Sequence, residues 1–115
     1  MSSLLGPVTD ADLRRWQRRR FDLLSELMRA QDQRELPPLT WTLSVHNLVG
    51  TVTGHHPNEI RRIFDAWVIA LGLDRSPEVH HDTGRIHLRA EAKDLWGRGV
   101  GVVVMADVWE DHPAD

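Results

Sequence analysis

The fold of this chain is decided by one segment, 39-LTWTLSVHNLVGTV-52. Apolar and small polar side chains alternate on both sides of His46-Asn47, which is the two-residue period of a strand with one buried face. A turn at this dipeptide predicts a hairpin in which Val45 pairs with Leu48. In that register the apolar face holds Trp41, Leu43, Val45, Leu48, Gly50 and Val52. The segment therefore predicts a sheet with one apolar face and one face in water.

Two amphipathic helices flank this hairpin in the sequence. The first begins after Thr9, an N-cap with Asp12 as its capping-box partner, and is expected to end by Arg34. The second begins at Pro57 and ends at Gly72, a residue suited to a left-handed C-cap. The core-facing stripe predicted for the first helix is Leu13, Trp16, Phe21, Leu23, Leu24, Leu27 and Met28. That of the second is Ile60, Ile63, Phe64, Trp67, Val68, Ala70 and Leu71.

A second hairpin and a last strand complete the pattern. Residues 78–81 and 85–92 flank Asp82-Thr83-Gly84, a three-residue hairpin loop, and residues 99–109 alternate with apolar side chains on both faces. We therefore expect a single α+β domain over residues 1–115, with fraying at 1–8 and 110–115. Its order is α-β-β-α-β-β-β, with a mostly antiparallel sheet of four or five strands and both helices on one face. A ferredoxin-like split β-α-β arrangement is the alternative.

Composition narrows the class of protein. The 115 residues are 41% hydrophobic with a net charge of -3, which is ordinary for one globular domain and too weak to attract a polyanion by itself. The absence of cysteine excludes disulfides and thiol catalysis. No segment approaches the roughly 20 apolar residues of a membrane span, so we expect a cytoplasmic protein without a membrane anchor. The basic residues are arginines apart from Lys93, a bias typical of bacteria with GC-rich genomes.

Histidine is frequent, with seven residues in the chain. The weak candidates for a metal site are His55, His56, His80 and His81, since imidazole suits zinc. Their spacing argues against such a site, because neighbouring residues on a strand point to opposite faces and no H-E-x-x-H motif is present. We therefore expect solvated loop histidines, one partly buried histidine at His80, and no metal.

A basic cluster around Trp16 in the first helix includes Arg14, Arg15 and Arg18. A helix face whose charges pair among themselves is one interpretation, since Asp22 follows Arg18 at i+4. An acidic protein partner is the second. Nucleic acid is the third and is disfavoured, because acidic residues bring the segment 10–35 close to neutrality and the polar sheet faces lack stacking aromatics.

The last predicted strand carries a further candidate surface. Val103, Met105 and Trp109 would form an apolar strip on a sheet face that is otherwise polar, which is typical of a protein-binding surface. Alternatively, the loop 93–98 covers this strip, with Trp96 folded over it. The sequence leaves this question open, and it does not identify the partner or the oligomeric state.

No set of residues indicates catalysis. The glycine-rich run 97–101 opens into a strand, whereas phosphate-binding glycine loops open into a helix, so a turn is expected. Asp107 stands alone in an apolar strand. We therefore expect a non-catalytic protein-interaction module without a cofactor, such as a small regulator, an immunity-type inhibitor or a secretion chaperone, which binds a protein partner or itself as a homodimer. A regulator associated with nucleic acid through the arginines, and a histidine-based metal or ligand site, are the alternatives.

Overall fold

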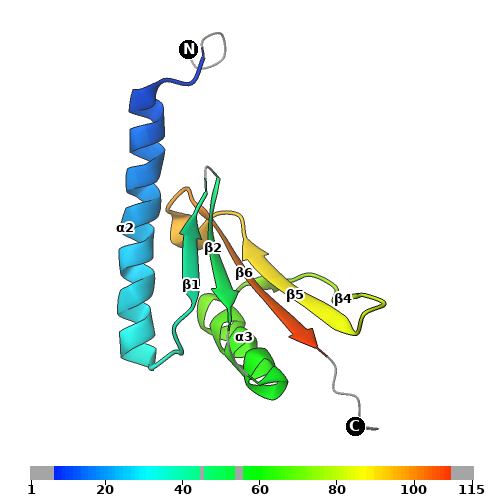
Figure 1. Ribbon diagram of the computed structural model, residues 1–115. Helices are drawn as coiled ribbons and strands as arrows, with labels where there is room; N and C mark the ends of the chain where they lie inside the picture. The colour runs from blue at the N-terminus through cyan, green and yellow to red at the C-terminus, as the bar shows by residue number, and fades with distance from the viewer. Residues whose placement is uncertain (1–6, 45, 54–55, 110–115) are drawn as a thin grey trace, which may run out of the picture.

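The computed structural model describes residues 7–44, 46–53 and 56–109 (Figure 1). The elements are α2 (Asp10–Arg34), β1 (Thr40–Leu43), β2 (Asn47–Val52), α3 (Pro57–Leu71), β3 (Asp74–Arg75), β4 (Val79–His80), β5 (Arg85–Ala92), the short 3-10 helix η1 (Leu95–Gly97) and β6 (Gly101–Trp109). The predicted α+β class and the predicted order of elements are confirmed. The ends 1–6 and 110–115, where fraying was expected, lie outside the described residues.

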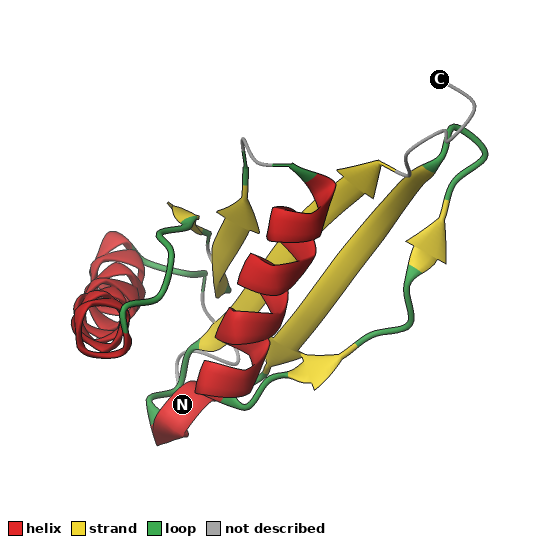
Figure 2. Ribbon diagram, turned by 90° about the horizontal axis from the view of Figure 1, so that it is seen from below, coloured by secondary structure: helices red, strands yellow, loops and turns green. Residues whose placement is uncertain are grey.

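The sheet has six strands in the order β1-β2-β6-β5-β3, with β4 also paired to β5. It is mixed, because β2 and β6 run parallel while the other pairs are antiparallel. These pairings give β3 the same direction as β2, so α3 crosses from one to the other over β6 and β5 (Figure 2). The ferredoxin-like alternative also has a helix between parallel strands, but the observed order is that of the main prediction.

The first hairpin keeps its predicted faces with a different register. Leu43 pairs with Leu48 and Trp41 with Gly50, two residues away from the predicted pairing. The cause is a wider turn, in which the Ser44 hydroxyl accepts from the Asn47 N–H and donates to the Asn47 carbonyl, both at 3.0 Å. A shift of two residues leaves every side chain on its face. The predicted partner Val45 lies outside the described residues.

The core lies between the apolar sheet face and the helices. Trp67 on α3 is fully buried, packs edge-on against Trp41 with ring centroids 5.7 Å apart, and donates its indole N–H to the Pro37 carbonyl at 2.7 Å. Both helices contribute to one buried cluster. Its main members are Leu23 and Leu27 from α2, Ile60, Ile63, Phe64, Trp67, Val68 and Leu71 from α3, and Leu48, Val52, Ile86, Leu88, Ala90, Val102, Val104, Ala106 and Val108 from the sheet.

The predicted stripe of α2 is only partly buried. Leu23 and Leu27 are in the core, whereas Leu13, Phe21 and Met28 are exposed, which corrects the prediction for these three. A helix of this length spans about 37 Å, whereas a four-residue strand such as β1 spans about 13 Å. The helix stands beside the β1 edge, and its N-terminal end projects past the hairpin tip (Figure 1). The sheet is therefore too short to reach Leu13. Phe21 and Met28 are exposed for another reason, since at 100° per residue they lie about 100–160° around the helix from Leu23 and Leu27.

Candidate functional site

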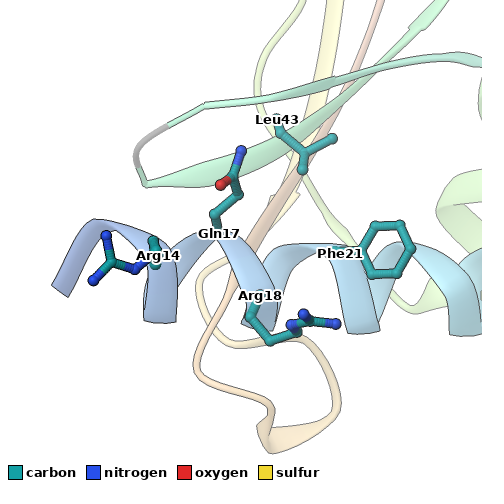
Figure 3. Close-up of a pocket in the computed structure, with 5 residues that line it drawn as sticks. All are labelled: Arg14, Gln17, Arg18, Phe21 and Leu43. Carbon is teal, nitrogen blue, oxygen red and sulfur yellow. The ribbon is translucent and has the colours of Figure 1, made fainter. Parts of the chain in front are cut away.

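A groove lies between the N-terminal half of α2 and the end of β1, with a volume of about 420 Å³ (Figure 3). It is lined by Arg14, Gln17, Arg18, Phe21 and Leu43. Gln17 on α2 points toward Leu43 on β1, and Phe21 follows one turn later. The two arginines extend on either side of Gln17. The groove thus combines apolar walls with two cations.

The apolar walls of this groove are open to solvent. Phe21 is 53% exposed and Leu43 is 38% exposed, although both belong to the apolar faces of their elements. Each therefore leaves apolar area in water that a partner could remove. An apolar patch bordered by polar groups is typical of an interaction surface.

The N-cap of α2 holds this half of the helix in place. The Thr9 hydroxyl accepts from the Asp12 N–H at 3.1 Å, and the Asp12 carboxylate accepts from the Thr9 N–H at 3.1 Å. The bond from the Thr9 backbone N–H, followed by the Thr9 side chain and Arg15, lowers the pKa of Asp12. Arg15 also donates to Asp12, which engages one of the three arginines that the sequence singled out. Arg14 and Arg18 are the two that line the groove.

Thr9→Ala is expected to remove about 1 kcal/mol from the stability of the first turns of α2, because the capping box is lost. Hydrogen exchange of the amides of residues 12–17 measures this effect, which should appear as faster exchange there and unchanged exchange in α3. Thr83→Ala, in the exposed loop between β4 and β5, is the matched control. Equal protection of residues 12–17 in wild type and Thr9→Ala would contradict a stabilising cap.

The groove arginines are not neutralised within the described part of the chain. No carboxylate there forms an ion pair with Arg14 or Arg18, and the i, i+4 pair of Arg18 with Asp22 is not formed. The interpretation of a self-paired helix face therefore holds for Arg15 and not for these two. Their charge is available to an external anion.

The predicted strip on the outer face of β6 is discontinuous. Val103 is 3% exposed and Met105 is half-buried, while Trp109 is 53% exposed. Between Met105 and Trp109 stands Asp107, whose carboxylate lies 2.9 Å from Nδ1 of His87. Trp109 alone offers a large apolar surface.

The loop before β6 does not cover this strip. Leu95 turns into the core cluster, and Arg98 donates to Glu26 of α2 at 2.7 Å, so the loop lies on the helix side of the sheet. Trp96 is exposed. Trp96 is therefore not packed in the core, yet Val103 in the strip is itself buried, so neither of the two arrangements that the sequence left open describes the whole strip.

The candidate histidines are dispersed. His55 lies outside the described residues, and His56 is the N-cap of α3, where its Nδ1 accepts from the Asn58 N–H at 3.3 Å. His81 lies 3.1 Å from a guanidinium nitrogen of Arg85. Across residues 7–44, 46–53 and 56–109, no group of three or more metal-ligating side chains is assembled.

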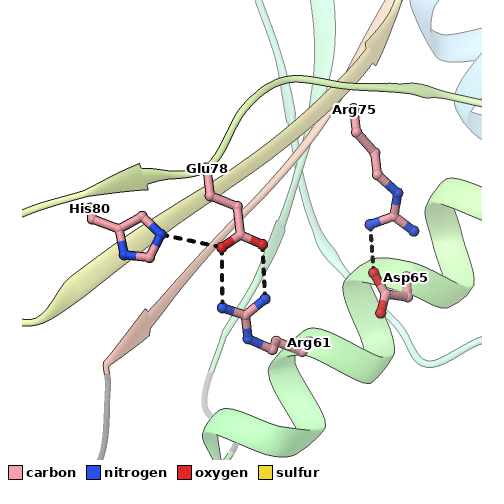
Figure 4. Close-up of polar contacts among 5 residues, drawn as sticks. All are labelled: Arg61, Asp65, Arg75, Glu78 and His80. Atoms are coloured by element: carbon pink, nitrogen blue, oxygen red, sulfur yellow. Dashed lines mark hydrogen bonds and ion pairs between the residues drawn. The ribbon is translucent and has the colours of Figure 1, made fainter.

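The last candidate, His80, belongs to a polar network that joins the segment after α3 to the helix (Figure 4). Its Nε2 lies 3.5 Å from Glu78, which accepts two hydrogen bonds from Arg61 at 3.0 and 3.4 Å. These bonds from Arg61 lower the pKa of Glu78. Arg75 donates to Asp65 at 2.6 Å and adds a second connection. The network connects the two elements through exposed ion pairs, and His80 is itself exposed, which corrects the prediction of its partial burial.

Comparison with known protein families, with curated proteins and with solved structures finds no match to this chain. Within the described segments, neither helix combines the length and the apolar character that a membrane crossing needs.

Proposed function

We propose that this chain is a non-catalytic protein-interaction module that binds an acidic, partly apolar segment of a partner protein in the groove between α2 and β1. One observation carries the proposal. Two exposed apolar side chains, Phe21 and Leu43, line the same groove as Arg14 and Arg18, which have no carboxylate partner in the described part of the chain.

The chemistry of the groove defines the partner. A large aliphatic or aromatic side chain placed between Phe21 and Leu43 would remove both from water, and such buried anchors dominate the energy of protein interfaces. Aspartate or glutamate on the same segment would meet the guanidinium groups, which match carboxylates in a two-point geometry. Charge complementarity of this kind also speeds association and makes it sensitive to salt. An acidic apolar peptide therefore fits the groove better than an all-apolar one.

Three other interpretations receive less support. A nucleic acid would need several cations along its path, and the groove offers two beside an apolar wall. The outer face of β6 stays a second candidate surface for the same function, because Trp109 is exposed at its end. A second copy of this chain could also occupy the groove. The sedimentation experiment below distinguishes it from an acidic partner.

Selection of random displayed peptides on the full chain is expected to enrich sequences that place acidic residues next to a large apolar one. Affinity of the selected peptide should fall at least about tenfold in Arg14→Glu/Arg18→Glu, since attraction becomes repulsion, and its dependence on salt should weaken. Isothermal titration measures both. Phe21→Ala should weaken binding through loss of apolar contact without changing the salt dependence.

The matched controls are Arg29→Glu, an exposed arginine on α2 that does not line the groove, and Trp109→Ala on the outer strip. Both should bind the peptide as the wild type does. Loss of binding in Trp109→Ala with normal binding in the groove variants would move the function to the outer strip. Sedimentation of the wild type tests the remaining occupant, because a dimer that dissociates in Phe21→Ala would assign the groove to a second copy and overturn an acidic partner.

A further inference from the structure

A second hollow, of about 290 Å³, lies on the other flank of α2. At 100° per residue, the helix positions that line it are on the opposite side from the groove. It is lined by Trp16, Arg19 and Arg20 of α2, His46 of the first hairpin turn, and Gly99 and Val100 before β6. Three segments that are distant in the sequence therefore meet here.

The lining of this hollow is cationic. Two guanidinium groups and one imidazole border it, and none of the described residues that line it carries a carboxylate. Two acids of the neighbouring loop and of α2 are engaged by other groups. Asp94 accepts from the Gly99 N–H at 2.6 Å, and Glu26 accepts from Arg98 at 2.7 Å.

The glycine-rich loop brings its backbone against these cations. A Cβ atom added to Gly99 would lie 3.7 Å from Nη1 of Arg19, and Gly99 has φ +74°, a value that side chains of L-residues disfavour. The run 97–101 is a turn that opens into β6, as the sequence predicted, and it contributes one wall of a hollow whose cations come from elsewhere.

The remaining side chains that line the hollow are apolar. Trp16 is half-buried and Val100 is buried, so the hollow offers an indole ring and an aliphatic side chain beside its cations. Its volume is close to the lower limit of about 300 Å³ for small-molecule pockets. Guanidinium groups recognise phosphate in a two-point geometry, and indole stacks on planar rings.

We propose that this hollow is a binding site for a phosphate monoester of a small planar-ring compound, of the size of a mononucleotide. The phosphate meets Arg19 and His46, which are the exposed cationic side chains of the lining, and the ring lies against Trp16. This site is independent of the proposed peptide groove, since no residue lines both.

Titration of the full chain with three probes tests the assignment. Adenosine 5′-monophosphate is expected to bind at least about tenfold more tightly than inorganic phosphate, because the ring adds contact with Trp16, and adenosine alone is expected to give no measurable heat. Arg19→Gln should weaken nucleotide binding at least about tenfold. Arg19 is exposed, so this variant should fold, and thermal unfolding verifies it. Chemical shifts of the Trp16 indole and the Gly99 amide should move only with the nucleotide and phosphate.

Two variants separate this site from the rest of the surface. Arg29→Gln and Phe21→Ala should bind the nucleotide as the wild type does, and the second also distinguishes a failure of this site from a failure of the peptide groove. Absence of nucleotide binding overturns the proposal. Equal affinity for adenosine and its monophosphate, or unchanged affinity in Arg19→Gln, also overturns it.

Discussion

Replacing Trp67 with alanine is expected to lower the free energy of unfolding by about 3–5 kcal/mol. Trp67 is fully buried at the centre of the core, so the truncation removes its apolar area and leaves a cavity beneath Trp41. It also removes the hydrogen bond to the Pro37 carbonyl, which ties the chain between α2 and β1 to α3. A domain of this kind has about 5–15 kcal/mol of stability in total. The variant should therefore be close to unfolding at ambient temperature.

Chemical denaturation followed by circular dichroism measures this loss. Trp109→Ala is the matched control, because it truncates the same side chain at an exposed position and should change the stability by less than about 0.5 kcal/mol. Similar losses in the two variants would contradict the assignment of Trp67 to the core. A Trp67→Phe variant separates the two contributions, since it retains most of the packing and lacks the indole donor.

Leu27→Ala is expected to cost about 2–5 kcal/mol, because the side chain is fully inaccessible at the contact of α2 with the core. Leu13→Ala makes the same chemical change fourteen positions earlier on the same helix, where the side chain is 42% exposed, and should cost much less. The comparison measures how firmly each half of α2 is attached. Denaturant titration of the two variants gives both values under the same conditions.

Equal losses in this pair would contradict the described position of α2. They would mean that its N-terminal half is packed as tightly as its second half, which leaves no space for the groove at Phe21 and Leu43. The pair thus tests, without any ligand, the geometry on which the proposed function depends. Phe21→Ala should resemble Leu13→Ala in stability, so its effect on peptide binding can be read without a correction for unfolding.

Local signals in the sequence were sufficient for both helices and for the main strands, although the observed β1, β4 and β6 are shorter than the predicted ones. The capping box of Thr9 and Asp12 and the left-handed Gly72 act within one turn of the chain, so the helix ends they mark are confirmed. Alternation assigned the faces of β5 correctly as well. The two-residue strand β3 (Asp74–Arg75) was missed, because two residues are too few to show a period.

The candidate site could be predicted only in part. Periodicity placed Phe21 and Leu43 on apolar faces, but it carries no information on how much of the sheet lies opposite them. Their exposure follows from the rotation of α2 and its position beside the edge strand β1, which are properties of the assembled fold. The arginine cluster could be identified in the sequence. Which arginine binds Asp12 and which two line the groove depends on the rotation of the helix, and only the structure shows it.

The position of β6 has a consequence for how the chain reaches this state. It follows every other described element, yet it lies in the middle of the sheet between β2 and β5. During synthesis the two hairpins on either side can form early from local contacts, but no strand pairs with both of them until Gly101–Trp109 has left the ribosome. The nascent chain therefore presents two unsatisfied strand edges until translation has passed this point, and cooperative folding starts late.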